Sequence, residues 1–305
     1  MRLLQDERRW GEAETVLALG MFDGVHRGHA RLLETARHAA RARGAQCVAF
    51  TFSHHPLAVL RPQDAPLLLT LPGEKATEMA RLGLDALVMR RFDAAFGALP
   101  AEVFVAHLAA TLRPREVIVG FNYHFGAHGQ GDSQLLRTLG ARYGFTTRVL
   151  PPVCWRGQPV SSTRAREAVL AAREEEARLL LGRPYSFCGV VRPGKRIGRA
   201  IGYPTANLIP PRGKALPPYG VYAVWALVEG QRFPAIMNLG IHPTVPDGPP
   251  TIEVHLLDAC RALYGRRITV ELTAHLRPEV RFDTLDDLRA QIALDIATVR
   301  DALRL

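Results

Sequence analysis

The stretch "GMFDGVHRGH" (Gly20–His29) decides the fold of the first half of the chain. It follows the apolar run "TVLAL" (15–19) and precedes the helical pattern "ARLLETARHAARARG" (30–44), so a strand passes through a glycine-rich turn into a helix. Glycine lets the backbone approach a ligand closely, and a helix that begins near His29 points its free N–H groups and positive dipole end at the same place. The stretch therefore predicts an anion site, and its glycines are Gly20, Gly24 and Gly28.

The two histidines of this turn, His26 and His29, allow three interpretations. As neutral or cationic donors they would hold phosphate oxygens at the anion site. As metal ligands they have the spacing HxxH without the glutamate of HExxH, although His54 and His55 could supply further imidazoles. They could also be structural residues that fill the turn. The position between a strand and a helix favours phosphate.

Short apolar runs alternate with helical patterns from residue 15 to about 182. The predicted strands are 15–20, 45–52, 86–92, 116–120 and 146–153, and the predicted helices are 29–43, 73–83, 100–112, 132–143 and a long one over 161–182. This alternation is typical of an α/β fold with a doubly wound parallel sheet and helices on both faces. Ligands of such sheets bind beyond the carboxyl ends of the strands.

The composition changes after Pro184. Twelve of the 22 prolines lie between 184 and 250, and short β-rich runs replace the long helical periods there. The runs predict a C-terminal antiparallel β-barrel, which a terminal amphipathic helix over 284–304 follows. They are 185–192, 220–230, 232–240, 251–259 and 266–277. We expect two domains, 1–183 and 184–305.

The bulk composition narrows the class of protein and its partners. The 305 residues are 48% hydrophobic and 22% charged, and no stretch approaches the roughly 18 apolar residues of a membrane helix. The polar start "MRLLQDERRWGEAE" is no signal peptide, so we expect a cytoplasmic protein without a membrane partner. Only three of the 39 basic residues behind the net charge of +10 are lysines, and no basic block occurs, so we expect no nucleic-acid partner.

The cysteines give no sign of a metal site or a disulfide framework. They are Cys47, Cys154, Cys188 and Cys260, far apart and without a CxxC pair. We expect reduced, partly buried thiols.

The end of the first half supplies a second cluster suited to phosphate. "PVSSTRAREAV" (159–169) places hydroxyls at the start of the predicted helix and Arg164 and Arg166 in its first turn. Alone, S-S-T-x-x-R is a weak signal, because serine is a common helix cap. Together with the histidine turn on a doubly wound sheet it indicates a phosphate site.

The second half contains a glycine loop and two polar strand segments. "VVRPGKRIGRAIGYPTANL" (190–208) does not match the Walker pattern GxxxxGK[ST]. Alternate residues of an extended segment face one side, so Thr205 and Asn207 could address one Mg²⁺ ion and its bound phosphates. Glu253 and His255 share one face of a predicted strand. Glu253 could take a proton from an attacking hydroxyl, but the pattern alone favours a residue on an exposed sheet face.

These motifs together carry a family resemblance. "GMFDGVHRGH" with "SSTRAR" resembles the nucleotidyltransferases that move an AMP or CMP unit, and more closely the chain is similar to bacterial bifunctional riboflavin kinase/FAD synthetase. The supporting segments are "FTFSHHP" (50–56), "LLLT" (67–70), "FDAAFGALPAEVFV" (92–105), "VGFNYHFGAHGQGD" (119–132), "GKRIGRAIGYPTANL" (194–208), "PPYGVYAVWA" (217–226), "NLGIHPTV" (238–245), "IEVHLLDACRALYG" (252–265) and "LRPEVRFDTLDDL" (276–288). The similarity departs from the family at His54, which replaces a proline, at Ala165, which replaces a larger apolar residue, and at Tyr203, which replaces a phenylalanine.

The resemblance implies that the first, Rossmann-like domain adenylylates FMN to FAD with ATP and releases pyrophosphate. It implies His29 and Asn122 as catalytic residues. It assigns ATP and its phosphates to Gly20, Phe22, Asp23, Gly24, His26, Gly28, His29, Ser162, Thr163 and Arg166. It assigns the flavin to Phe52, His55, Pro56, Asn122 and Phe125, with Phe121 and Tyr123 as further aromatic faces. Core packing is the alternative role for each of these aromatic residues.

For the second domain the resemblance implies a six-stranded Greek-key barrel that phosphorylates riboflavin to FMN with ATP. Thr205 and Asn207 would bind Mg²⁺ and the ATP phosphates, and Glu253 would act as general base on the ribityl 5′-hydroxyl. The nucleotide and flavin are assigned to Gly194, Lys195, Gly198, Arg199, Gly202, Thr205, Asn207, Asn238 and Arg277, with Thr244 as a further candidate. The expected partners are riboflavin, FMN, FAD and ATP, and the chain is either a monomer or a transient homo-oligomer.

Two other functions stay open on the sequence. In the first, one module has lost its activity and serves as a binding or structural domain; the presence of every residue with a chemical role in both halves argues against it. In the second, the chain is a flavin-sensing or RNA-binding regulator, which would need a clustered basic surface that the linear sequence does not show.

Overall fold

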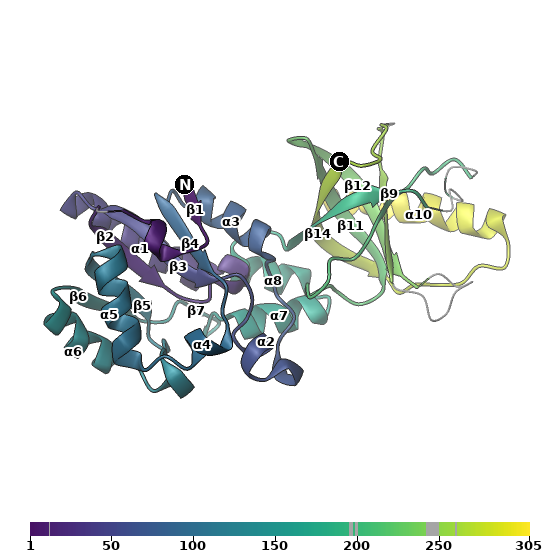
Figure 1. Ribbon diagram of the computed structural model, residues 1–305. Helices are drawn as coiled ribbons and strands as arrows, with labels where there is room; N and C mark the ends of the chain where they lie inside the picture. The colour runs from purple at the N-terminus through teal and green to yellow at the C-terminus, as the bar shows by residue number, and fades with distance from the viewer. Residues whose placement is uncertain (12, 195–197, 199–200, 242–249, 260) are drawn as a thin grey trace. The chain divides into compact units, whose positions relative to one another are not determined.

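The computed structural model describes residues 1–305 except 12, 195–197, 199–200, 242–249 and 260 (Figure 1). The chain divides into two compact units, Met1–Ser162 and Thr163–Leu305. This division precedes the expected domain boundary at 183/184 by two helices, α7 (Ser162–Leu170) and α8 (Glu174–Leu181), and the boundary stays a prediction.

The first unit is built on a six-stranded sheet whose neighbouring strands all run parallel. Its order is β1-β4-β3-β2-β5-β6, with β1 Arg2–Leu4, β2 Thr15–Leu19, β3 Gln46–Phe52, β4 Ala86–Arg90, β5 Pro114–Gly120 and β6 Thr146–Leu150. The five predicted strands are confirmed. Strand β1 was not predicted, because three residues in a polar segment form no apolar run.

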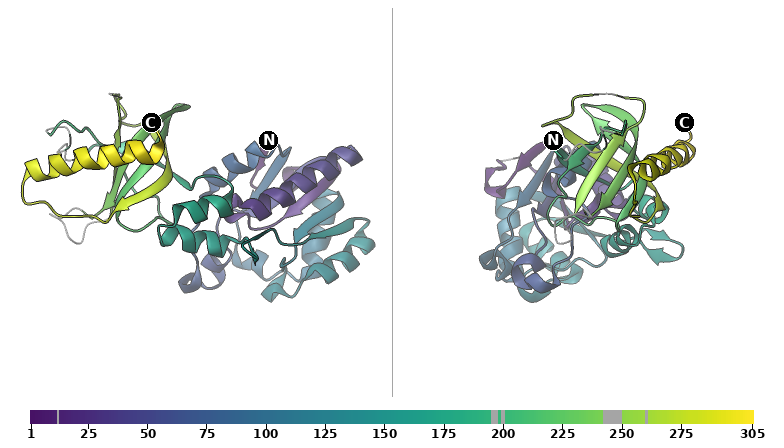
Figure 2. Two further views of the ribbon diagram at one scale, coloured as in Figure 1. Left: turned by 180° about the vertical axis from the view of Figure 1, so that it is seen from behind. Right: turned by 90° about the vertical axis from the view of Figure 1, so that its right-hand side faces the viewer.

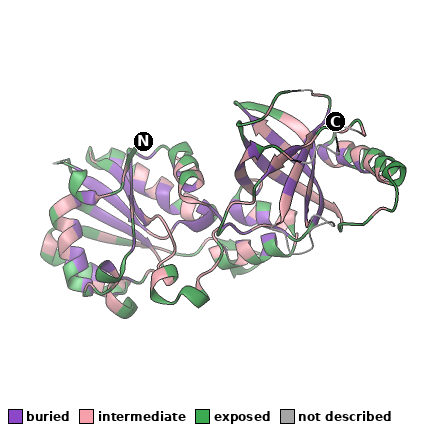
Figure 3. Ribbon diagram, turned by 45° about the vertical axis from the view of Figure 1, so that its right-hand side comes forward, coloured by how far each residue is buried: buried purple, intermediate pink, exposed green. Residues whose placement is uncertain are grey.

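Helices cover both faces of this sheet. Alternate residues of β2 enter different cores: Val16 and Ala18 join a cluster with Leu33 of α1, whereas Leu17 and Leu19 join a cluster with Phe104 of α5. The helices are α1 Arg27–Arg43, α2 Leu57–Leu60, α3 Pro72–Arg81, α4 Ala94–Gly97, α5 Ala101–Leu112 and α6 Ser133–Tyr143. The 3-10 turns are η1 Glu7–Arg9, η2 Asp23–Val25, η3 Pro62–Asp64 and η4 Ala127–Gly129, and β7 Cys154–Trp155 pairs with β8 Gln158–Pro159. Figure 3 shows the sheet strands as the most buried part of this unit, so the doubly wound prediction is confirmed.

The long helix predicted over 161–182 is wrong. The segment forms two helices, α7 Ser162–Leu170 and α8 Glu174–Leu181. Ala172 between them has a left-handed φ of 49°, and the Arg173 N–H donates to the Ala168 carbonyl while the Ala172 N–H donates to the Val169 carbonyl. These two bonds form a Schellman C-cap. Because alanine occupies the position that glycine usually takes, the sequence carries no stop signal.

The second unit contains a closed antiparallel barrel with the strand order β10-β13-β12-β11-β14-β9, closed by the pairing of β9 with β10. Its strands are β9 Ser186–Arg192, β10 Ala206–Leu208, β11 Gly220–Val228, β12 Gln231–Gly240, β13 Thr251–Leu256 and β14 Arg267–Arg277. Helix α10 (Leu285–Leu303) lies beside the barrel (Figure 2) and begins after Thr284, whose hydroxyl accepts from the Asp287 N–H. Val299 and Leu303 of this helix pack on Val221 and Ala223 of the barrel wall. The predicted barrel and terminal helix are confirmed.

Two further expectations concern the whole chain. No helix in the described part of the chain is both long and apolar enough to span a membrane. Of the cysteines, Cys47, Cys154 and Cys188 are free, and burial raises the pKa of the Cys47 thiol to about 12; Cys260 lies outside the described residues.

Candidate functional site

Three loops of the first unit leave the same edge of the sheet. They follow the carboxyl ends of β2, β3 and β5, and they begin at Gly20, Phe52 and Gly120. Strand β2 has β3 on one side and β5 on the other, so the strand order reverses at β2. A crevice beside such a reversal is the usual ligand site of an open α/β sheet.

The turn after β2 has a strained backbone that a neighbouring segment holds in place. Phe22 and Val25 have left-handed φ angles of 49° and 42°, which bulky and β-branched residues rarely adopt. The Asp23 carboxylate accepts from the N–H groups of Leu69 and Thr70 at 3.1 and 3.0 Å, and the Thr70 hydroxyl accepts from the Gly24 N–H at 2.9 Å. Asp23 is buried, so its carboxylate supports the turn.

His26 and His29 stack on each other at the start of α1. Their ring centroids are 3.6 Å apart with an angle of 16° between the planes, and His26 Nδ1 accepts from the His29 N–H at 3.3 Å. A Cβ on Gly28 would lie 3.0 Å from His26 Cε1, so glycine makes room for this ring. Burial, then His26 and Lys75, hold the pKa of His29 well below its usual range. Within the described residues His29 Nδ1 is buried without a hydrogen-bond partner, which suits a neutral imidazole at an anion site.

The metal interpretation of these histidines gains no support. Across the described ranges no group of three or more His, Cys, Asp or Glu residues could hold a metal ion. The imidazoles of His54 and His55 are engaged elsewhere, His54 with Ser53 and the Phe92 carbonyl and His55 with the Leu57 N–H.

The "SSTRAR" segment is fastened to the turn at its first helical residue. The Ser162 hydroxyl donates to the Asp23 carbonyl at 2.9 Å. Thr163 and Arg166 follow on α7 and belong to the second unit. Ala165 is fully buried, which fits a small residue in place of the larger apolar one.

The aromatic residues assigned to the flavin differ in exposure. Phe52 lies at the end of β3 in edge contact with Phe92 and Phe96, at centroid distances of 5.1 and 5.5 Å. Phe125 is buried and packs on Phe104 at 5.7 Å, so its ring belongs to the core. Phe121 is 50% exposed, and Asn122 beside it is exposed at the carboxyl end of β5. Phe121 and Asn122 are therefore the exposed members of this group, whereas Phe52, His55 and Pro56 are partly buried.

The His54 departure from the family has a structural consequence. His54 Nε2 lies 2.8 Å from the Phe92 carbonyl oxygen, and Nδ1 lies 3.1 Å from the Ser53 hydroxyl. With its proton on Nε2, the ring donates to the carbonyl and Nδ1 accepts from the hydroxyl. This side chain holds the loop that begins at Phe52 and ends at Pro56, just before α2.

Lys75 was missed by the sequence analysis. It lies on α3 and is 1% exposed, and its ammonium group donates to the carbonyls of Met21 and Phe52 at 2.9 and 3.1 Å. Burial lowers the pKa of Lys75 to about 8. Its spacing from Met79 was the available signal, since a lysine four residues before an apolar residue shares its helix face.

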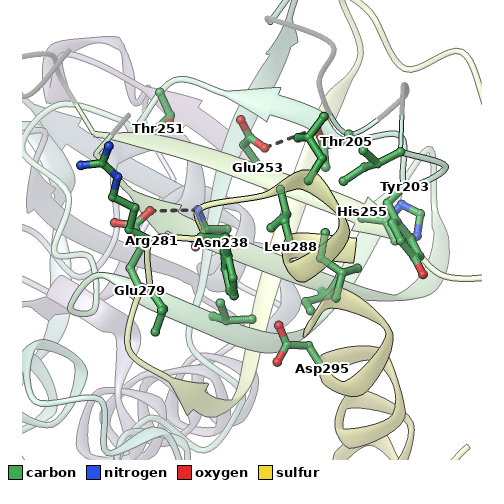
Figure 4. Close-up of a pocket in the computed structure, with 18 of the residues that line it drawn as sticks. Tyr203, Thr205, Asn238, Thr251, Glu253, His255, Glu279, Arg281, Leu288 and Asp295 are labelled. Carbon is green, nitrogen blue, oxygen red and sulfur yellow. Dashed lines mark hydrogen bonds between the residues drawn. The ribbon is translucent and has the colours of Figure 1, made fainter. Parts of the chain in front are cut away.

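A cavity of about 570 Å³ in the second unit gathers most of the residues assigned to the kinase (Figure 4). Strand register places Asn207 of β10 and Asn238 of β12 on either side of Glu253 of β13. The Thr205 hydroxyl lies 3.5 Å from Glu253 Oε2. Three strands therefore present a carboxylate and two amides to one cavity, and Thr205, directly before β10, adds a hydroxyl. Glu253 and His255 share a face as predicted.

The glycine loop of this site is partly described. A Cβ on Gly194 would fall 2.5 Å from the Asn207 side chain, and one on Gly198 would fall 2.4 Å from the Tyr203 carbonyl oxygen. Both positions therefore need glycine for a close approach, and Gly202 has a left-handed φ of 91°. Lys195, Arg199 and Thr244 lie outside the described residues.

Helix α10 closes one side of the cavity through an ion pair. The guanidinium of Arg277 forms a fork with the carboxylate of Asp295, with a shortest distance of 2.7 Å, and Gln291 also donates to Asp295. Glu279 accepts from the Asn238 amide at 3.2 Å. Glu279 and Asp295 were not predicted, because each meets its partner only through the fold.

These two sites define the class of protein: a two-unit transferase that handles nucleotide phosphates, with a nucleotidyltransferase-type sheet and a phosphotransferase-type barrel. Family models agree with both halves. The FAD synthetase model matches residues 9–164, and the riboflavin kinase model matches residues 181–303.

Curated relatives carry both activities in one name. The chain is 41% identical over 288 residues to the bifunctional riboflavin kinase/FMN adenylyltransferase of Escherichia coli (strain K12), covering 94% of this chain and 92% of the relative. It is 37% identical to the protein of that name from Pseudomonas fluorescens (93% and 92% covered) and 33% identical to the one from Bacillus subtilis (strain 168) (93% and 91% covered). The chain belongs to the bifunctional riboflavin kinase/FMN adenylyltransferase family. It phosphorylates riboflavin to FMN and adenylylates FMN to FAD.

A solved structure shares the whole fold under a different description. The crystal structure described as a macrolide-efflux protein from Streptococcus pneumoniae has a TM-score of 0.88 and 30% identity, and the match covers 98% of each chain. Its description stands apart from the flavin-enzyme names of the family models and curated relatives.

Proposed function

We propose that Glu253 is the general base of the riboflavin kinase reaction and that Thr205, Asn207 and Asn238 arrange the substrates around it. The observation that carries the proposal is the strand register, which sets Asn207, Glu253 and Asn238 in one row across β10, β13 and β12. Side chains fixed by a closed barrel keep their spacing without help from a ligand. A carboxylate in such a row can accept the proton of the ribityl 5′-hydroxyl as it attacks the γ-phosphorus of ATP.

Mg²⁺ is the proposed metal of the kinase site. The Thr205 hydroxyl and the Asn207 amide oxygen are hard oxygen donors of the kind that Mg²⁺ prefers, and Mg²⁺ usually binds through few protein ligands together with substrate phosphates. When bound, it would neutralise charge on the transferred phosphoryl group. A chelator should abolish FMN formation and added Mg²⁺ should restore it. The N207A variant should also bind ATP more weakly by titration calorimetry in the presence of Mg²⁺. Kinase activity in metal-free buffer would overturn this assignment.

The E253Q variant tests the general base directly. We expect FMN formation from riboflavin to fall by about 10²–10⁴-fold, while FAD formation from supplied FMN is unchanged. A matched control is E271Q, since Glu271 lies on barrel strand β14 and pairs with Arg232 at 3.0 Å outside the cavity. Chromatographic separation of FMN and FAD over time measures both reactions in one sample. If E253Q keeps the kinase rate of E271Q, Glu253 is not the base.

We further propose that ATP phosphates bind at the turn Gly20–His29 and that the flavin of FMN lies toward the loop Phe52–Pro56 and Asn122. The support is the shared edge of the sheet, the neutral His29 ring and the N-terminus of α1. The protein's contribution to adenylyl transfer is then positioning and stabilisation of charge on the α-phosphate. The domain boundary at 183/184 and the cytoplasmic location remain predictions.

A further inference from the structure

We propose that Lys75 is a positioning residue for FMN adenylylation, because its buried ammonium group ties the phosphate turn (Gly20–His29) to the flavin-side loop (Phe52–Pro56). The proposal rests on the assignment of ATP and FMN to these two segments. It concerns a residue outside both, on α3, whose side chain reaches the place where they leave the sheet.

The tie consists of two hydrogen bonds to main-chain carbonyls. Lys75 Nζ donates to Met21 O at 2.9 Å and to Phe52 O at 3.1 Å. Met21 is the second residue of the phosphate turn, and Phe52 is the first residue of the flavin-side loop. The Thr51 hydroxyl also donates to Met21 O at 2.9 Å. One carbonyl of each segment is therefore fixed to a common point.

A lysine at position 75 lowers the stability of the fold unless its buried ammonium group forms favourable interactions. Lys75 is 1% exposed, and transfer of an ammonium group out of water is unfavourable. Met79, one turn further on α3, is completely buried, so methionine would suit this helix face. The ammonium group offers what methionine lacks, several donors on one atom that reach carbonyls from two separate loops.

The same charge faces the histidine pair. Asp23 from η2 stabilises the charged form of Lys75. Burial first, then His26 and Lys75, lower the pKa of His29 and so disfavour its protonation. Asp23, His26, His29 and Lys75 thus form one electrostatic group drawn from η2, α1 and α3. Loss of the lysine charge should raise the pKa of His29, and loss of its two hydrogen bonds should alter the spacing of the two segments.

The experiment compares K75M with K75Q in the full-length chain. In K75M both tie bonds are absent, and we expect kcat for FAD formation from FMN to fall by about 10- to 100-fold, because a displacement of about 1 Å between reacting groups has effects of this size. K75Q keeps an N–H donor and should retain more activity than K75M. Both variants lack the charge, so the His29 ionisation in the pH–rate profile should move to higher pH in both.

Three internal controls make the outcome decisive. The riboflavin kinase activity of K75M and K75Q should be unchanged. K214M, which replaces the other buried lysine among the described residues, lies in the second unit and should not affect FAD formation. Full kcat in folded K75M would overturn the proposal. So would loss of the unfolding transition of the first unit in both variants, since Lys75 would then serve core stability. If H29A also keeps full FAD formation, the assignment of ATP to the turn fails; if H29A is inactive and K75M is not, only the Lys75 proposal fails.

Discussion

The proposed phosphate sites of the two units are built in different ways. In the first unit, a short contiguous turn supplies backbone N–H groups, a helix N-terminus and two stacked imidazoles. The buried Asp23 carboxylate of this turn stabilises its backbone through two hydrogen bonds. In the second, a cavity collects side-chain oxygens from strands far apart in the sequence, aligned by barrel register. The first site is local and strained, and the second is assembled by topology.

This difference predicts where each site is vulnerable. A turn held by backbone geometry depends on the few residues that shape it and on the segments that fasten it, such as Thr70 and Lys75. A site assembled across strands depends on the residues that hold helix α10 against the cavity, such as Arg277 and Asp295. Substitutions in one unit should leave the other reaction intact, and the predictions below test that separation.

The largest effect is expected for H29A. If His29 stabilises charge on the transferred group, as proposed, its loss should lower kcat/KM for FAD formation by about 10³-fold, or about 4 kcal/mol. Riboflavin kinase activity should be unchanged. H38A is the matched control, because His38 is an exposed histidine on the same helix. If H29A forms FAD at the rate of H38A, the turn Gly20–His29 does not bind the ATP phosphates, and the comparison between the two sites fails.

The next effect is expected for D295N in the barrel unit. Asp295 is 5% exposed and Arg277 is mostly buried, so the substitution leaves a guanidinium without its anion. Breaking such a pair should lower the free energy of unfolding of this unit by about 3 kcal/mol. The KM for riboflavin should rise as α10 loosens, with FAD formation unaffected. D301N, at an exposed position of α10, should behave like the wild type in denaturant titration. Equal unfolding midpoints for the two variants would contradict the prediction.

The contrast between the sites also decides what the sequence could reveal. The phosphate turn is contiguous, so its glycines, histidines and place between a strand and a helix can be recognised without a structure. Glu253 could not be placed in this way: its alternating strand suggests an exposed face, and only the register with Asn207 and Asn238 brings it into a site. Long-range partners such as Arg277 and Asp295 leave no local signal.

Other departures have local physical causes. The break between α7 and α8 depends on the left-handed φ of Ala172. The sequence does not predict this break, because the left-handed position at a helix end is usually occupied by glycine. The resemblance places Phe125 on the flavin side as an aromatic residue of the segment "FNYHFG", and the fold buries its ring against Phe104. Lys75 was passed over because lysine is mostly an exposed residue.

A smaller effect concerns the pH dependence of stability in the first unit. Burial lowers the pKa of Lys75 from 10.5 to about 8 in the folded protein. Below pH 8 the ammonium is charged in both folded and unfolded states, and the burial penalty is fully present. As the pH rises from 8 toward 10.5 the folded protein loses this proton first, so its free energy of unfolding should rise relative to K75M by about 2 kcal/mol. Urea titrations of both proteins across this range measure the difference, and a constant difference would contradict the assigned pKa.

The smallest effect is expected for substitutions of His54. They test whether the flavin-side loop keeps its conformation through its own backbone or through the contact of His54 with a distant segment. H54A loses the bond to the Phe92 carbonyl and the contact with Ser53, so we expect the KM for FMN to rise about fivefold, close to 1 kcal/mol, with little change in kcat. H54P restores the residue that the family resemblance leads us to expect, and it should recover the wild-type KM because a fixed φ replaces the side-chain bond. Riboflavin kinase activity is the control in all three proteins. If H54P binds FMN as weakly as H54A, the loop depends on the imidazole itself, and the loop is then held by a contact between distant segments, as the kinase site is.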